Sequence, residues 1–251
     1  MLSRFMLYLL NLYFYTLFIL LSASVIPLLT IYVVCLGLLF PSRRRTMKRF
    51  RRAINWYGMV VIAIPYPFIK VCYEDHGENA PGTPYIFVCN HRSAADAFLI
   101  GILPNELVQI VNVWPFRIPV LGIYAKFAGY LNIRMMPAEQ FSQCATRLIK
   151  DGVSIVFFPE GTRSSGKKMG SFHGSAFRLA LESKAAIVPL CLSGTETVMP
   201  KGSSLLHPGV IRVRSLAAIT QDEYKDLTAF AVKNRVWKII DRELSAMENP
   251  V

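Results

Sequence analysis

The stretch Pro84-Tyr85-Ile86-Phe87-Val88-Cys89-Asn90-His91-Arg92-Ser93-Ala94-Ala95-Asp96 decides how this chain folds. Its apolar first half, Pro84–Cys89, predicts a buried strand, and the residues from Ser93 to Leu103 predict a helix. A buried strand followed directly by a helix is typical of a parallel sheet covered by helices. Two residues whose side chains can exchange protons, His91 and Asp96, stand at the turn between these elements.

The same alternation continues to the end of the chain and predicts an α/β fold with a central, mostly parallel sheet flanked by helices. The turn-rich segment Glu74–Pro84 is expected to be a linker or a surface turn. Further strands are expected at Glu106–Val111, Tyr130–Arg134, Val153–Phe158, Ala186–Leu192 and Val210–Leu216. Further helices are expected at Pro119–Ala128, Ala138–Lys150, Phe172–Ser183 and over most of Asp222–Met247.

The N-terminal segment predicts a membrane anchor. From Phe5 to Ser42 no residue is Asp, Glu, Lys, Arg or His. One helix over this run would exceed a hydrocarbon core of roughly 30 Å, so we expect a hydrophobic membrane helix or a helical hairpin bent near Pro27. A cleaved signal peptide is the alternative, because Arg4, the apolar run and Ser22-Ala23-Ser24 imitate its layout. Apolar residues continue to Phe40, however, so cleavage would leave a membrane segment behind.

A basic block follows the apolar run, with seven Lys or Arg among the ten residues 43–52. This position is typical of a cytoplasmic flank that binds anionic headgroups, although a plain stop-transfer flank has the same composition. The chain has a net charge of +12 but no basic stripe interleaved with aromatic residues, so membrane lipids are expected as partners and nucleic acid is not. We therefore expect two parts in the chain. Residues 1–70 are expected to anchor it in the membrane, and residues 71–251 are expected to form a domain on the cytoplasmic face.

Metal and redox chemistry are not predicted by the sequence. The five cysteines are odd in number, scattered and set among apolar residues, and no spacing matches a metal site. A thiol in a domain that faces the cytosol is expected to stay reduced.

His91 and Asp96 have two readings. If both lay on one helix they would be about 140° apart, but they can meet if His91 precedes the helix and Asp96 lies in its first turn. The imidazole could then take a proton from a hydroxyl while the carboxylate fixes its tautomer. Ser93 and Asp96 are also spaced like an N-cap residue and an N3 acid, so a purely structural capping role explains the same pattern.

A second polar cluster, Phe158-Pro159-Glu160-Gly161-Thr162-Arg163, closes the strand predicted at Val153–Phe158. The run from Gly161 to Lys168 fits the first part of a P-loop pattern, but Lys168 stands where a hydroxyl residue should bind Mg²⁺. A nucleotide site is therefore not expected. What remains is a glycine-containing turn that presents Arg163 for contact with a phosphate, or else an ordinary surface turn.

Together, Asn90-His91-Arg92-Ser93-Ala94-Ala95-Asp96 and Phe158-Pro159-Glu160-Gly161-Thr162-Arg163-Ser164 resemble motifs of the glycerolipid acyltransferases, typified by 1-acyl-sn-glycerol-3-phosphate acyltransferase. Gly129-Tyr130-Leu131-Asn132-Ile133-Arg134 and Ile187-Val188-Pro189-Leu190-Cys191-Leu192-Ser193-Gly194-Thr195 are similar to two further blocks of that family. The four blocks occur in the family's order over about residues 84–216.

This resemblance implies a membrane enzyme that moves an acyl chain from acyl-CoA or acyl-ACP to the free sn-2 hydroxyl of a lysophospholipid acceptor, most simply lysophosphatidic acid. It implies that His91 is the general base and that Asp96 orients it. It further implies that the acceptor is held by Glu160, Gly161, Thr162 and Arg163, with Arg134 adding positive charge. The implied reaction needs no metal and no cofactor beyond the acyl donor.

Two departures from the family's pattern widen the choice of acceptor. Asn112, Val113 and Trp114 replace a lysine-bearing segment before Pro119, and His173 replaces the basic residue before Gly174. Both changes remove positive charge, so a larger or less anionic lysophospholipid is an alternative acceptor. An acyltransferase that acts on glycerol-3-phosphate is a further alternative. A membrane-tethered protein that binds acidic lipids without catalysis is the alternative outside enzymes. Trp114, Phe116 and Tyr124 are candidates for an acyl channel or for plain core.

Overall fold

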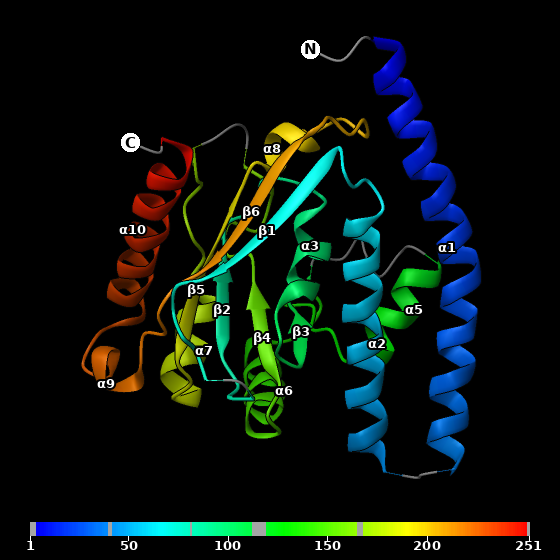
Figure 1. The fold of residues 1–251 in the computed structure, drawn as a ribbon. Helices are drawn as coiled ribbons and strands as arrows, with labels where there is room; N and C mark the ends of the chain where they lie inside the picture. Colours follow the sequence, from blue (N-terminus) through cyan, green and yellow to red (C-terminus); the bar gives the residue numbers. More distant parts are fainter. Residues whose placement is uncertain (1–3, 40–41, 81, 112–118, 165–167, 250–251) are drawn as a thin grey trace. The chain divides into compact units, whose positions relative to one another are not determined.

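The computed structural model describes residues 4–39, 42–80, 82–111, 119–164 and 168–249 (Figure 1). The chain forms two compact units, each made of several segments. The first unit consists of Met1–Cys72, Arg92–Leu103 and Gly194–Arg212. The second unit consists of Tyr73–His91, Pro104–Ser193 and Val213–Val251. The two-part organisation expected from the sequence, with a boundary at residue 70, stays a prediction.

The central sheet has the strand order β1-β6-β5-β2-β4-β3 in the part of the chain that the structure describes. Strand β2 pairs in parallel with β4 and β5, and β3 pairs in parallel with β4. Every residue of β2, β4 and β5 is buried, because helices cover such strands. The expected α/β class with a mostly parallel sheet is confirmed. The strands are β1 Ile69–Asp75, β2 Ile86–Cys89, β3 Leu107–Gln109, β4 Ser154–Phe157, β5 Ile187–Ser193 and β6 Gly209–Ser215.

The helices of the second unit follow their predicted apolar faces. Helices α5 (Pro119–Ala128) and α6 (Ala138–Lys150) have the bounds expected from the sequence. On α6, the buried residues Phe141, Ala145 and Ile149 recur every four positions and face the core. Helix α7 (Ser175–Ser183), the short α9 (Gln221–Tyr224) and the long α10 (Ala229–Glu248) lie in the same unit, and α10 packs against α7 and β5.

The first unit contains a helical hairpin. Helix α1 runs without interruption from Arg4 to Leu39 and includes Pro27. Of the two expected forms, the single long apolar helix is confirmed and the bend near Pro27 is wrong. Helix α2 (Arg43–Ala63) takes in the basic block and the mostly apolar residues that follow it, and it packs against α1 (Figure 1). The amide of Asn11 on α1 donates to the carbonyl of Leu206 at 2.9 Å and accepts from its N–H at 2.8 Å, which ties α1 to the segment Gly194–Arg212.

Short helices complete the first unit: α3 (Asp96–Leu99), the 3₁₀ turn η1 (Ile100–Ile102) and α8 (Thr195–Val198). Helix α2 approaches α3 and η1 closely at two glycines. A Cβ atom at Gly58 would lie 3.1 Å from the carbonyl oxygen of Phe98, and one at Gly101 would lie 2.8 Å from that of Asn55. Only glycine permits the second of these contacts without a backbone shift, so α2 is held to the loop that carries Asp96.

Two expectations about connections are corrected. Glu74 and Asp75 belong to β1, where a linker or surface turn was expected, and of that segment only residues 76–80 and 82–84 are described as irregular. In the segment Tyr130–Arg134, expected as a strand, one bridge forms between Leu131 and Ile110, and a turn follows.

Candidate active site

Within the second unit, the end of β2 is fixed by Asn90. Its buried side-chain amide donates to the carbonyl of Leu192 at 2.9 Å and accepts from the N–H of the same residue at 2.8 Å. This paired contact replaces two ladder hydrogen bonds where β2 ends beside β5. The next residue, His91, therefore leaves the sheet from a defined position.

The backbone of His91 is bound by the loop that follows β4. Its N–H donates to Oε1 of Glu160 at 2.8 Å, and its carbonyl accepts from the N–H of Ser164 at 2.8 Å. The half-buried imidazole also packs against Phe158, with 4.6 Å between the ring centroids. The two polar clusters predicted from the sequence thus meet at the carboxyl edge of neighbouring parallel strands, where functional groups of α/β sheets commonly lie.

Glu160 is buried, and its two carboxylate oxygens accept from two different segments. Oε1 accepts from His91, and Oε2 accepts from the N–H of Gly170 at 2.8 Å. A carboxylate accepts hydrogen bonds and donates none, and bonds to its charged form are stronger than bonds between neutral groups. These contacts tie the turn after β4 both to His91 and to the segment before α7.

Gly161 adopts φ +69, which glycine tolerates best. A Cβ atom at this position would lie 3.1 Å from Cδ2 and Nε2 of His173. The backbone N–H of His173 in turn donates to the carbonyl of Pro159 at 2.8 Å. His173, named in the sequence as a departure from the family's pattern, is exposed, and its ring lies against Gly161.

The other predicted acceptor residues differ in exposure. Thr162 is exposed and Arg163 is half-buried in the same loop. Arg134 is exposed in the turn after Leu131, where Oδ1 of Asn132 accepts the N–H of Arg134 at 2.9 Å. Tyr124 on α5 is half-buried, whereas Trp114, Phe116 and the departures at residues 112–114 lie outside the described residues.

Asp96 lies in the first unit and is fully buried. Its Oδ2 accepts from the backbone N–H of Arg92 at 2.7 Å and of Ser93 at 2.8 Å. The contact from an acid to the N–H three residues earlier is half of the predicted capping arrangement. The α-helix itself begins at Asp96, later than expected, and the Ser93 hydroxyl donates to the carbonyl of Met199 at 2.8 Å. The carboxylate therefore closes the turn that starts directly after His91.

The first unit also contains an apolar cavity of about 200 Å³. Its walls come from α1, the end of α2, the loop and helix around Asp96, and the segment Gly194–Arg212. Ala94 and Ala95, within the His91–Asp96 motif, line it together with Phe98. The wall contributed by α1 includes Phe14, Tyr15 and Phe18. The sequence did not predict this cavity, because its lining comes from segments far apart in the chain.

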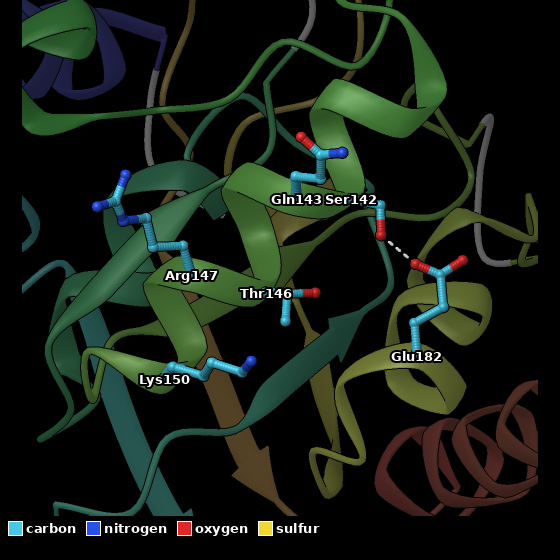
Figure 2. Close-up of a pocket in the computed structure, with 6 residues that line it drawn as sticks. All are labelled: Ser142, Gln143, Thr146, Arg147, Lys150 and Glu182. Carbon is cyan, nitrogen blue, oxygen red and sulfur yellow. Dashed lines mark hydrogen bonds between the residues drawn. The ribbon is translucent and has the colours of Figure 1, made fainter.

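A second hollow, shallow and lined by residues with polar or charged side chains, lies over α6 and α7 (Figure 2). The Ser142 hydroxyl donates to Glu182 there. None of the site residues predicted from the sequence lines this hollow. Its hydroxyl and carboxylate are exposed to solvent and no histidine is among the described residues that line it, so we assign the chemistry to the His91 region. Among the described residues no group of three or more His, Cys, Asp or Glu could hold a metal ion.

Comparison with known proteins identifies the family of the chain. Residues 72–193 match the family model described as Acyltransferase. The chain is 35% identical over 182 residues to the chloroplastic 1-acyl-sn-glycerol-3-phosphate acyltransferase LPAT1 of Arabidopsis thaliana, which covers 70% of this chain and 49% of the relative. It is 31% identical over 176 residues to the 1-acyl-sn-glycerol-3-phosphate acyltransferase of Saccharomyces cerevisiae, covering 66% of this chain and 57% of the relative. The chain thus spans about half the length of these relatives.

The fold has a counterpart among solved structures. The crystal structure of the 1-acyl-sn-glycerophosphate acyltransferase PlsC from Thermotoga maritima superposes with a TM-score of 0.80 at 22% identity, covering 99% of this chain and 98% of the other. This likeness establishes the fold. The ordered motifs, the family match and the sequence relatives show that the chain belongs to the acyltransferase family that includes the 1-acyl-sn-glycerol-3-phosphate acyltransferases.

Proposed function

We propose that this protein is a membrane-bound acyltransferase that transfers an acyl chain from acyl-CoA or acyl-ACP to the sn-2 hydroxyl of lysophosphatidic acid, giving phosphatidic acid. The observation that carries this proposal is the hydrogen bond between His91 and Glu160, which joins the two motifs at one edge of the sheet. Relatives whose names give this activity support it. Their greater length leaves the activity of this chain a proposal.

The proposed reaction uses His91 as general base. The imidazole takes the proton of the acceptor hydroxyl as its oxygen attacks the thioester carbonyl, and the C–S bond then breaks. The leaving thiolate takes the proton back, so no covalent enzyme intermediate and no metal are needed. Asp96 is proposed to orient the imidazole. A placed base of this kind contributes roughly 10²–10⁴ in rate, and holding the two substrates together contributes further.

The acceptor phosphate is proposed to bind at the turn after β4. Arg163 can make bidentate contact with a phosphate, and Gly161 and Thr162 lie in the same exposed turn. Arg134 is exposed and adds positive charge on the segment after Leu131. His173 stands against Gly161, and it replaces the basic residue of the family's pattern named in the sequence analysis. This weaker positive charge favours, as the second candidate, a lysophospholipid with a less anionic headgroup.

The acyl chain is proposed to occupy the apolar cavity of the first unit. Its lining is almost entirely hydrocarbon and aromatic, which suits a fatty acyl chain and no polar ligand. Each methylene moved from water into such a cavity stabilises the complex by about 0.8 kcal/mol. Ala94 and Ala95, which line the cavity, precede Asp96 in the chain by two residues and one residue.

The α1–α2 hairpin is proposed to hold the protein in one face of the membrane. Helix α1 is long and apolar enough to cross a bilayer by length and composition, and only 6% of its most apolar window is buried. Its 36 residues would measure about 54 Å, well over a hydrocarbon core of roughly 30 Å. If α1 crossed, α2 would have to return through the hydrocarbon with its seven basic residues, at a large cost.

The hairpin therefore favours an arrangement in which α1 lies in the interface and α2 places its basic half on anionic headgroups. Each Lys or Arg near such a surface contributes about 1 kcal/mol. We propose the cytoplasmic face, because basic segments beside membrane helices are retained there.

The test is a transfer assay on the purified full chain with labelled acyl-CoA and acyl-ACP. The acceptor panel contains lysophosphatidic acid, glycerol-3-phosphate, lysophosphatidylcholine, lysophosphatidylethanolamine and lysophosphatidylglycerol. The proposal expects lysophosphatidic acid to have the highest kcat/KM. A preference for another lysophospholipid would correct the headgroup alone. Absence of transfer with every pair would instead favour the lipid-binding protein.

A further inference from the structure

Glu160 belongs to the motif that the family resemblance connects with the acceptor, yet its environment is that of a structural carboxylate. The side chain is 7% exposed, and each oxygen accepts a backbone N–H, from His91 and from Gly170. A carboxylate offers only acceptors, so it cannot donate to an acceptor's phosphate, and its charge repels one. The geometry is that of a brace between two loops.

Gly170 is the second residue that Glu160 binds, and this contact requires a residue without a side chain. A Cβ atom there would lie 2.9 Å from Oε2 of Glu160, closer than a real Cβ contact. The carbonyl of Gly170 accepts the indole N–H of Trp237 at 2.8 Å. Gly170 is thus held on its N–H by Glu160 and on its carbonyl by an indole from another element.

Trp237 lies on α10, outside all four sequence motifs. It is half-buried and packs against the core of the second unit, so its indole is a rigid donor. Helix α10 itself packs on β5 and α7. The chain of contacts therefore runs from α10 through Trp237, Gly170 and Glu160 to the backbone of His91, all within one compact unit.

We propose that Glu160 is a positioning residue for His91, and that Trp237 is the remote anchor of the same hydrogen-bond chain. Glu160 acts through the backbone of His91 and does not bind the acceptor. The kinetic part of this inference rests on the proposed acyltransferase function, whereas the structural part does not. The two roles differ in their kinetic effect: loss of an acceptor-binding group raises KM, and loss of a positioning group lowers kcat.

The variants are Glu160→Gln and Trp237→Phe, made in the full chain in detergent micelles. An amide keeps the shape of Glu160 but has only one acceptor oxygen, so one of the two N–H groups faces an NH₂ group. Phenylalanine keeps most of the indole's apolar volume and removes the donor. The matched control is Glu182→Gln, a carboxylate of the same unit whose partner is the Ser142 hydroxyl in the polar hollow (Figure 2).

Kinetics supply the first readout. With Glu160→Gln we expect kcat to fall about 100-fold, the effect of a small misplacement of a reacting group, with acceptor KM within about twofold of the wild type. Trp237→Phe should lower kcat less, again at unchanged KM. Glu182→Gln should change neither. A raised acceptor KM at unchanged kcat in Glu160→Gln would restore the acceptor-binding role and overturn the inference.

Amide NMR supplies a readout that needs no activity. The chain contains four histidines, so protein labelled with ¹⁵N-histidine gives four backbone amide signals, and His91→Ala assigns one of them. An N–H bonded to a carboxylate resonates downfield, so Glu160→Gln should move the His91 signal upfield. Trp237→Phe should move it in the same direction by a smaller amount, and Glu182→Gln should leave it in place.

The two readouts separate the possible failures. If Glu160→Gln leaves the His91 amide unmoved, the brace is wrong whatever the kinetics. If the wild type transfers no acyl group while the amide shifts as expected, the proposed function fails and the brace stands. If Glu160→Gln does not fold, both measurements are made on Trp237→Phe. An unmoved His91 amide signal together with an unchanged kcat in Trp237→Phe would then overturn the inference.

Discussion

The guanidinium of Arg92 lies 3.2 Å from the carboxylate of Glu196, and the two side chains are 1% and 11% exposed. This ion pair joins the residue directly after His91 to helix α8. The segment that carries Glu196 begins at Gly194, where φ is +87 and a Cβ atom would lie 2.2 Å from the carbonyl oxygen of Val210. Together with the bond from Ser93 to Met199, the pair fixes the loop that ends at Asp96.

Glu196→Ala is therefore expected to destabilise the protein strongly. Removing one partner leaves the buried Arg92 guanidinium without its counter-charge, which costs about 3–5 kcal/mol. Replacing both partners, as in Arg92→Met with Glu196→Leu, should recover much of that loss because both charges of the pair are then removed together. Urea-induced unfolding of the solubilised protein measures both values.

The control for this prediction is Asp222→Asn, which removes the exposed ion pair with Lys225. Exposed pairs of this kind contribute less than about 1 kcal/mol. A loss in Glu196→Ala no larger than in this control would show that the Arg92 pair does not hold the loop.

The sequence predicted the central strands and two of the flanking helices because their signals are local. Continuous apolar runs identified β2, β4 and β5, and the spacing of apolar residues identified α5 and α6 with their bounds. The resemblance to the acyltransferases placed His91 and the Glu160 turn in one site, and the structure brings them together through the parallel pairing of β2 with β4.

Other features lacked a local signal. Strand β1 ends in Glu74 and Asp75, whose charges and following turn residues imitate a linker. The basic half of α2 shows no apolar periodicity, so its helix was not expected. The bond from Trp237 to Gly170 joins residues 67 positions apart, and the bond from His91 to Glu160 uses a backbone N–H that any residue supplies. Such contacts depend on tertiary packing that one sequence does not reveal.

Gly161→Ala tests the turn that carries the predicted phosphate contacts. An alanine at φ +69 costs about 1–2 kcal/mol, and its Cβ would also press on the ring of His173 at 3.1 Å. Gly82→Ala is the matched control, because Gly82 has φ +81 with nothing within 4 Å of the added atom. We expect the larger loss of unfolding free energy at Gly161. Adding His173→Ala to Gly161→Ala should remove the excess, and equal losses at the two glycines would contradict the contact.

Phe18→Ala tests whether the apolar cavity holds the acyl chain. The substitution enlarges the cavity from the side of α1, so the preferred acyl-CoA should become longer by several carbons. The measurement is kcat/KM for a series of acyl-CoA chain lengths. Leu12→Ala, an exposed apolar residue on the same helix, is the control and should keep the wild-type preference. If the wild type, Phe18→Ala and Leu12→Ala all show the same chain-length preference, the acyl chain binds outside this cavity.

Tyr224 predicts a pH dependence of stability. Burial raises its pKa from 10.0 to about 12, and its hydroxyl donates to the carbonyls of Ala185 and Ala180 at 2.7 and 3.1 Å. The folded state holds the phenolic proton more tightly than the unfolded chain does. The contribution of Tyr224 to stability is therefore complete below pH 10 and is lost as the pH rises through about 12. The difference in unfolding free energy between the wild type and Tyr224→Phe should shrink over that range, whereas a constant difference would show that the hydroxyl does not titrate this way.

His91→Ala and Arg163→Ala separate the base from the phosphate contact. Removing the base should lower kcat by about 10²–10⁴ while circular dichroism stays unchanged, because the backbone of His91 makes the structural contacts.

Removing Arg163 should raise the KM for lysophosphatidic acid about tenfold or more, the effect of one charged hydrogen bond, with kcat little changed. Steady-state kinetics with varied acceptor give both values. Near-normal turnover in His91→Ala would remove it as the base, and an unchanged KM in Arg163→Ala would place the phosphate on another cation, for which Arg134, exposed after Leu131, is the next variant to measure.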